Sequence, residues 1–137
     1  MNAVVLDASV LLKLFIEEPG SVEAVTAVES AEQLLAPDLL LAESSNILWK
    51  HVQRGELEAT AAVELLTDIL QMPIQYTPSR DLVEVALRLA IETKQTVNDA
   101  LYLALAIQAD SVLLTTDERL ANSLASIPYA ARVQPIP

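Results

Sequence analysis

Short apolar runs alternate with helix-like segments along the whole chain, and this alternation most constrains the fold. Strand-length runs are expected at 3–6, 34–36, 74–77, 111–115 and 131–134. Segments with helical spacing of apolar residues are expected at 8–17, 22–32, 39–54, 58–71, 80–93, 98–109 and 117–125. Because parallel strands need long crossover connections, this order predicts an α/β protein with a parallel sheet covered by helices on both faces.

Helix boundaries are marked by a few residues with known preferences. Pro19-Gly20 is expected to end the first helix, and Ser21 is a candidate N-cap for the second. Asp38 is expected to cap the third helix, which Gly55 follows. Asn98 is the candidate N-cap for the helix at 98–109.

The chain has the properties of one intracellular domain. With 137 residues, no linker and no internal repeat, it is expected to form a single domain over 1–137. No apolar run approaches the roughly 18 residues needed to cross a membrane, and the N-terminus does not resemble a signal peptide. Cysteine is absent, which suits a cytoplasmic location.

Four acidic residues lie at the edges of apolar segments. Asp7 follows the first expected strand, and Asp117 follows the run Val112–Thr116. Glu43 interrupts an apolar stretch of the third helix, and Asp99 directly precedes the apolar stretch 100–106. Ligands of open α/β sheets bind outside the carboxyl ends of the strands. The order of elements therefore predicts one site that gathers all four carboxylates.

Carboxylates at such positions need a positive partner, because removing them from water is costly. The chain has only eight Lys and Arg against nineteen Asp and Glu, with one His and no Cys. Mg²⁺ or Mn²⁺ could supply the positive charge in place of Lys and Arg, since both ions prefer oxygen ligands. Together these observations point to metal-assisted phosphodiester chemistry.

Simpler explanations exist for single acids. Asp7, Asp99 and Asp117 each stand where an acidic residue stabilises a helix N-terminus. Glu43 has no such role and no Lys or Arg at i+3 or i+4. A phosphohydrolase with Asp7 as nucleophile is an alternative, although haloacid-dehalogenase-type sites need a second Asp where this chain has Ser9.

The acidic motifs together resemble the PIN-domain family, and within it the VapC-type toxins of toxin–antitoxin pairs. The resemblance rests on four segments in this order: Asp7-Ala8-Ser9-Val10, Glu43 with Asn46 and Ile47, 98–106 (NDALYLALA), and 115–120 (TTDERL). It covers essentially the whole chain. It implies a three-layer α/β/α sandwich with a five-stranded parallel sheet in the order 3-2-1-4-5.

The resemblance also implies an activity: a Mg²⁺- or Mn²⁺-dependent endoribonuclease, usually a homodimer, that a small antitoxin holds inactive. The family's metal ligands correspond to Asp7, Glu43, Asp99 and, less constantly, Asp117. Ser9 and Thr115 are expected to orient carboxylates. The remaining alternative is a non-catalytic PIN-like module that only binds a partner, against which the presence of all four acids argues.

Any RNA must be held by a local group of cations, because the net charge is −11 and phosphate is usually bound by basic surfaces. Lys50 and Arg54 fall on the same stripe of the third helix as Glu43, and Lys13 projects from the first helix. These cations are the candidate phosphate contacts, and a solvated helix face is the simpler reading. The acidic surface also suits docking onto a basic partner.

Overall fold

A computed structural model describes residues 2–124 and 128–137, and its centre is a five-stranded parallel sheet in the order β3-β2-β1-β4-β5. The strands are β1 (Ala3–Leu6), β2 (Gln33–Pro37), β3 (Ile74–Thr77), β4 (Val112–Thr115) and β5 (Val133–Pro135). Every pairing between neighbours is parallel. The strand order 3-2-1-4-5 implied by the family resemblance is confirmed.

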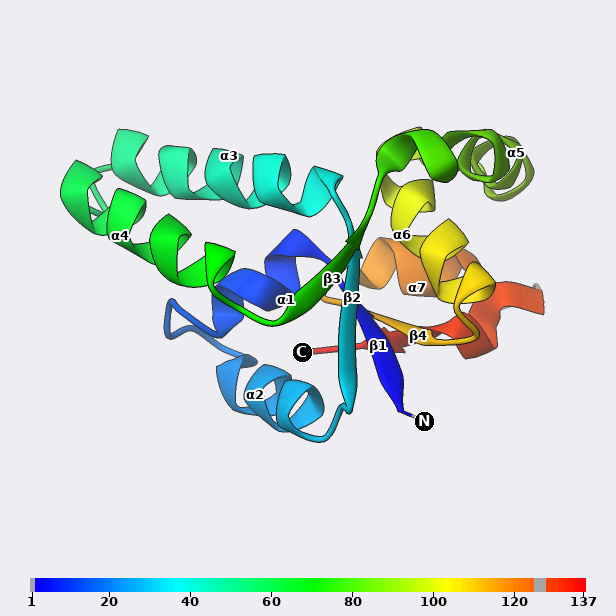
Figure 1. Ribbon diagram of the computed structural model, residues 1–137, viewed down its shortest axis with the longest axis horizontal. Helices are drawn as coiled ribbons and strands as arrows, with labels where there is room; N and C mark the ends of the chain where they lie inside the picture. Colours follow the sequence, from blue (N-terminus) through cyan, green and yellow to red (C-terminus); the bar gives the residue numbers. More distant parts are fainter. Residues whose placement is uncertain (1, 125–127) are drawn as a thin grey trace.

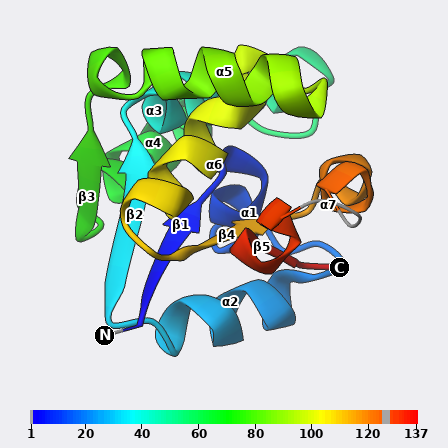
Figure 2. The same ribbon diagram turned by 90° about the vertical axis from the view of Figure 1, so that its right-hand side faces the viewer.

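Seven α-helices are present in the described part of the chain: α1 (Ala8–Lys13), α2 (Ser21–Glu29), α3 (Leu39–Gln53), α4 (Ala59–Leu70), α5 (Val83–Thr93), α6 (Val97–Gln108) and α7 (Glu118–Leu124). Figure 1 shows α1 to α4 on one side of the sheet and α5 and α6 on the other, which makes the three layers. In Figure 2 α6 crosses in front of the sheet, and α5 lies above α6. Residue 125 of the expected last helix lies outside the described residues.

The core forms where the central strands meet α6. Val5 and Leu6 of β1 and Leu114 of β4 are fully buried, and they are paired in register as Val5↔Leu113 and Leu6↔Leu114. All residues of α6 from Ala100 to Ala106 are buried as well. One hydrophobic cluster joins these elements. Burial of β1 on both faces explains why it is an uninterrupted apolar run.

The first loop differs from the sequence prediction. Helix α1 ends at Lys13, earlier than the expected residue 17. The N-cap of α2 is Gly20, not Ser21, and Gly20 adopts a left-handed conformation with φ of 93°. The Ser21 hydroxyl instead accepts a hydrogen bond from the Glu18 amide at 3.0 Å, inside the turn. A side chain at Gly20 would collide with the carbonyl of Pro137.

Two other expected caps act differently. Asp38 precedes α3 but does not cap it; its Oδ1 accepts hydrogen bonds from the Ser79 amide, at 3.0 Å, and the Ser79 hydroxyl. Asp38 therefore ties the ends of β2 and β3 together. Helix α6 is capped by the Thr96 hydroxyl, which accepts from the Asp99 amide, so the expectation for Asn98 was wrong.

One large aromatic side chain lies outside the core. Trp49 of α3 is 56% exposed. No helix among the described residues is long and apolar enough to cross a membrane.

Candidate active site

Asp7 lies at the carboxyl end of the central strand, where its side chain is held by three donors. Oδ1 accepts from the Ser9 hydroxyl at 2.7 Å and from the Val10 amide at 2.9 Å. Oδ2 accepts from the hydroxyl of Thr115, a fully buried residue at the end of the adjacent strand β4. Asp7 is thus both the N-cap of α1 and a fixed carboxylate between two strands. Ser9 and Thr115 both donate to the Asp7 carboxylate, and their orienting role at a metal site stays a prediction.

Glu43 meets its partner across the site. It extends from α3, and one of its oxygens accepts a hydrogen bond from the hydroxyl of Tyr102 on α6. The Tyr102 side chain is buried, with the residue only 3% exposed. The contact joins the two helical layers over the end of the sheet, and it fixes the direction of a carboxylate that helical geometry alone leaves mobile.

Asp99 and Asp117 share a cation. Nη2 of Arg119 lies 3.5 Å from Oδ2 of Asp99 and 3.5 Å from Oδ2 of Asp117. The other oxygen of Asp117 accepts from the Leu120 amide at 3.0 Å, which is an N-cap interaction for α7. The Asp117 amide in turn donates to the Thr115 hydroxyl at 3.0 Å, so Thr115 connects Asp7 to the α7 end of the site.

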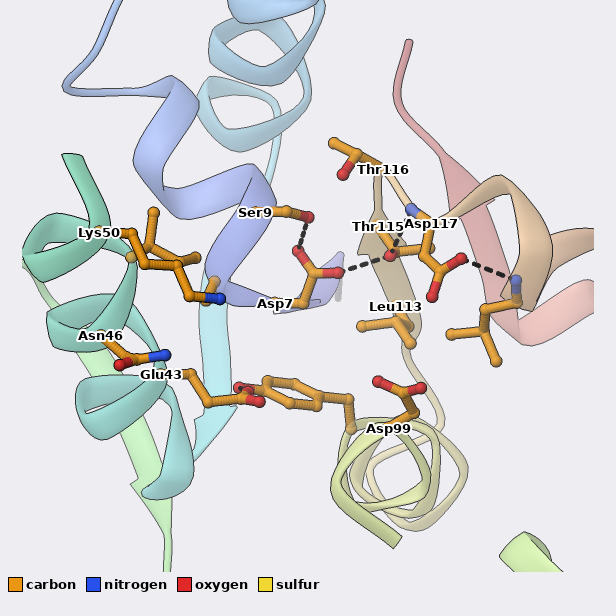
Figure 3. Close-up of a pocket in the computed structure, with 14 residues that line it drawn as sticks. Asp7, Ser9, Glu43, Asn46, Lys50, Asp99, Leu113, Thr115, Thr116 and Asp117 are labelled. Atoms are coloured by element: carbon orange, nitrogen blue, oxygen red, sulfur yellow. Dashed lines mark hydrogen bonds between the residues drawn. The ribbon is translucent and has the colours of Figure 1, made fainter. Parts of the chain in front are cut away.

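All four predicted acids line one open pocket of about 300 Å³ (Figure 3). Asp7 stands in its middle, between Glu43 on one side and Asp99 and Asp117 on the other. Ser9, Thr115 and Lys50 also line it. The pocket opens at the carboxyl ends of β1 and β4, the edge that the topology of an open α/β sheet predicts.

The donors in the pocket suit a hard divalent ion, because they are carboxylate oxygens with no sulfur or imidazole among them. Among residues 2–124 and 128–137, however, no three acidic side chains converge closely enough to chelate one ion as they stand. Their oxygens are instead turned toward the Ser9, Thr115, Tyr102 and Leu120 donors. Binding therefore requires bridging waters, which Mg²⁺ commonly retains, or small side-chain rotations.

The electrostatics of the pocket favour a cation. Burial raises the pKa of Asp7, although the hydrogen bonds from Thr115 and Ser9 work against the shift. Burial also raises the pKa of Glu43, against the opposing hydrogen bond from Tyr102, and the charges of Asp99 and Asp7 add to the increase. The pKa of Tyr102 is raised by burial and by Glu43, so its hydroxyl remains a donor. A positive ion bound nearby lowers the free-energy cost of ionising neighbouring carboxyl groups.

Of the three cations predicted to contact RNA, the structure brings only Lys50 to the pocket. Its side chain extends across the opening toward Asp7 (Figure 3). Lys13 instead contacts Glu18 at 3.2 Å and the Pro19 carbonyl in the first loop. Arg54 lies at the end of α3, 3.9 Å from Glu56. An RNA contact by Lys13 or Arg54 stays a prediction.

Sequence reasoning missed two side chains. Tyr102 was read only as part of an apolar helix, although a Tyr three residues after Asp99 falls on the same helical face. Arg119 was read only as part of the TTDERL segment. Its signal was a positive charge in the first turn of a helix, where the dipole disfavours cations. The Tyr102 contact with Glu43 and the Arg119 contact with Asp99 each join two different helices.

Replacement of Glu43 by Gln should stabilise the protein in EDTA at neutral pH. The raised pKa of Glu43 means that its ionised form is disfavoured in the folded state. That carboxyl therefore contributes most stability below its unfolded pKa, near 4.5, and loses it as the pH rises through the folded pKa. The melting temperature of Glu43→Gln should exceed that of the wild type at pH 7.5, with the gap closing toward pH 4.

The matched control is Glu64→Gln, an exposed position on α4. It removes the same charge without touching the pocket. A gap of equal size for both variants would show that relief of the net charge, not the pocket, is responsible.

Fold and site together define a parallel α/β protein with an acidic pocket at the carboxyl edge of its sheet. The model of the PIN domain family matches residues 4–123, and the chain belongs to this family.

Among its relatives is a protein named Ribonuclease VapC3 from Pyrobaculum aerophilum. The two are 34% identical over 125 residues, which cover 90% of this chain and 95% of that protein. The crystal structure of PAE2754 from the same organism superposes with a TM-score of 0.69 at 27% identity, over 89% of this chain and 79% of that one. A toxin–antitoxin complex from Klebsiella pneumoniae has the same fold, with a TM-score of 0.66 at 20% identity over 96% of this chain and 95% of that one.

Proposed function

We propose that this protein is a VapC-type endoribonuclease that hydrolyses RNA phosphodiester bonds with a divalent metal ion. The observation that carries the proposal is the pocket itself: carboxylates from a strand end, two helices and a helix start open on one cavity in a PIN domain. The relative named Ribonuclease VapC3 supports a ribonuclease, and the donor chemistry supports Mg²⁺ or Mn²⁺.

Asp7, Glu43 and Asp99 are the proposed principal ligands, and Asp117 borders the site with both of its oxygens already in contact with other groups. A bound Mg²⁺ or Mn²⁺ would neutralise charge on the phosphate and lower the pKa of a water to make it a usable nucleophile. The protein's own contribution is orientation. Ser9 and Thr115 fix the direction of the Asp7 carboxylate before an ion binds.

The substrate must approach a strongly acidic pocket, and Lys50 is the cation placed to help. Among the described residues no ion pair within 4.0 Å occupies its ammonium group, although it lines the pocket. We assign to Lys50 the contact with an RNA phosphate beside the scissile bond. Lys50→Ala should therefore raise the KM for RNA more than it lowers kcat.

An antitoxin partner, a homodimer and a cytoplasmic location are further proposals. The net charge of −11 suits an antitoxin segment that is basic. Light scattering of the purified protein tests the homodimer, and copurification with the product of a neighbouring small gene tests the antitoxin.

The test of activity is cleavage of a mixed pool of tRNA, rRNA fragments and mRNA. The wild type with Mn²⁺ or Mg²⁺ is compared with the same reaction in EDTA and with Asp99→Asn, which keeps the side chain's shape. We expect cuts that need metal and disappear in Asp99→Asn, while Asp68→Asn, an exposed position on α4, keeps them. Cleavage by Asp99→Asn at the wild-type rate would contradict the proposal.

Neither alternative is favoured by a specific observation. A phosphohydrolase of the haloacid-dehalogenase type with Asp7 as nucleophile needs a second Asp where this chain has Ser9. A module that only binds a partner would not need four acids around one pocket.

A further inference from the structure

Helix α5 presents an exposed apolar stripe on the outside of the molecule. Val83, Leu87 and Ile91 follow one another at intervals of four residues, so they lie on the same side of the helix. Their exposed fractions are 44%, 52% and 73%. Figure 2 shows α5 along the upper edge of the molecule, where a partner can reach it. Contiguous apolar side chains left exposed in this way mark a surface for interaction.

A row of alternating charges runs beside this stripe. Oε1 of Glu84 lies 3.0 Å from Nη2 of Arg88, and the two side chains are 81% and 77% exposed. At the same spacing of four residues, Arg80 lies in the turn before α5 and Glu92 lies one turn after Arg88. Glu92 is held in place by the Tyr129 hydroxyl, which donates to its Oε2 at 2.9 Å. The order along the row is therefore plus, minus, plus, minus.

The α5 segment is electrically neutral, although the chain as a whole is acidic. Residues 80–94 contain three Lys or Arg and three Asp or Glu, whereas the net charge of the chain is −11. The exposed apolar residues Val63 and Leu70 lie instead on α4, which carries Glu64 and Asp68 and no Lys or Arg. Two copies that met through α4 would therefore repel each other. The α5 surface suits a second copy of this chain.

The order of the charges makes the α5 surface complementary to itself. In a twofold-symmetric dimer with antiparallel helices, the same surface of each copy meets the other in reverse order. Reversal about the level of Ala86 exchanges positions 84 and 88, so Glu84 of each copy faces Arg88 of the other. The same reversal directs Arg80 toward Glu92. Opposite charges therefore meet along the whole row.

The same register also packs the apolar stripe. Reversal about the level of Ala86 places Leu87 of one copy between Val83 and Leu87 of the other. It places Val83 of one copy between Leu87 and Ile91 of the other. Each side chain thus enters a gap between two others, as ridges enter grooves where helices pack. One register therefore satisfies both the charges and the apolar side chains.

We propose that two copies of this chain associate through α5, with the helices antiparallel, Val83, Leu87 and Ile91 at the centre and the Glu84–Arg88 pairs beside them. The inference rests on the homodimer proposed above and gives it a contact surface. It does not depend on the ribonuclease activity, so the activity and the interface are tested separately.

The first test is the monomer–dimer equilibrium of the whole protein, measured by sedimentation equilibrium at several concentrations in low salt. Leu87→Glu should weaken the dimer by about tenfold or more, because the interface would then have to bury two carboxylates. Val63→Glu is the matched control, since it adds the same charge at an apolar position of α4 that is 66% exposed. It should leave the dissociation constant within about threefold of the wild-type value.

Exchange of charges tests the antiparallel register. Glu84→Arg and Arg88→Glu each place like charges opposite one another in a dimer of identical copies, so each variant alone should dimerise about three- to tenfold more weakly than the wild type. An equimolar mixture of the two should associate within about threefold of wild-type strength, because opposite charges again meet between copies. The mixed dimer has the total charge of the wild-type dimer, and each variant has lost the Glu84–Arg88 pair inside its own helix. Only contacts between copies can therefore restore the association.

Three results would each overturn the inference: a wild type that stays monomeric at every concentration, equal effects of Leu87→Glu and Val63→Glu, and folded charge variants that do not associate on mixing. Circular dichroism establishes that the variants are folded. A monomer that binds a copurifying antitoxin only while Leu87 is intact would assign the surface to that partner and would also overturn it. Metal-dependent RNA cleavage by a monomer would leave the proposed ribonuclease activity standing in each case.

Discussion

Asp7→Asn is expected to reduce metal-dependent RNA cleavage by about three orders of magnitude or more. Asp7 is the central carboxylate of the pocket and is oriented by Ser9, Val10 and Thr115. Metal ions contribute several kcal/mol to charge stabilisation in a transition state, and each 1.36 kcal/mol corresponds to about tenfold in rate. Initial rates with a defined RNA substrate and saturating Mn²⁺ measure the effect.

The substitution should leave the fold intact. Asn is as good an N-cap as Asp, so its side chain can still accept from the Val10 amide at the start of α1. The circular dichroism spectrum should therefore match that of the wild type. A folded Asp7→Asn protein that retains more than about a tenth of wild-type activity would remove Asp7 from the ligand set, since loss of a metal ligand cannot cost so little.

Divalent ions are expected to raise the melting temperature of the wild type by about 5–10 °C. A ligand at 100 times its dissociation constant stabilises the folded state by about 2.7 kcal/mol. In a domain of this size each kcal/mol corresponds to roughly 2–5 °C. The bound ion also removes the repulsion that, with burial, raises the pKa of Glu43. Thermal melts in EDTA and in excess Mn²⁺ give the shift.

General screening must be separated from binding, because a chain with a net charge of −11 is stabilised by any salt. Sodium chloride at equal ionic strength is therefore the reference condition. Asp99→Asn and Asp7→Asn should show the salt effect but little of the additional Mn²⁺ effect. Equal shifts with Na⁺ and Mn²⁺ in the wild type would mean that the pocket does not bind the ion.

Local sequence patterns were enough where burial alone decides the structure. The uninterrupted run Val4-Val5-Leu6 predicted the central strand because both of its faces are covered. Helix ends were predicted less well, since several polar residues compete for each cap. The N-cap of α6 is Thr96 and not Asn98. The N-cap of α2 is Gly20, which has a left-handed φ, and not Ser21.

The candidate site was predicted as a set of acids but not as a geometry. The positions of Asp7 and Asp117 follow from the ends of β1 and β4, which any parallel sheet brings to one edge. The hydrogen-bond partners of the acids cannot be predicted from the strand ends. The Tyr102 contact to Glu43 links residues 59 apart, and the Thr115 contact to Asp7 links residues 108 apart.

The sequence by itself determined the layered α/β architecture and singled out the four acids. These depend on periodicity and on residue type, which are local properties. The strand order was implied only by the family resemblance. Only the tertiary structure decided which oxygens face the pocket, that Lys50 reaches it while Lys13 and Arg54 do not, and that Arg119 lies between Asp99 and Asp117. Side-chain directions are set by packing between elements, and packing depends on the whole folded chain.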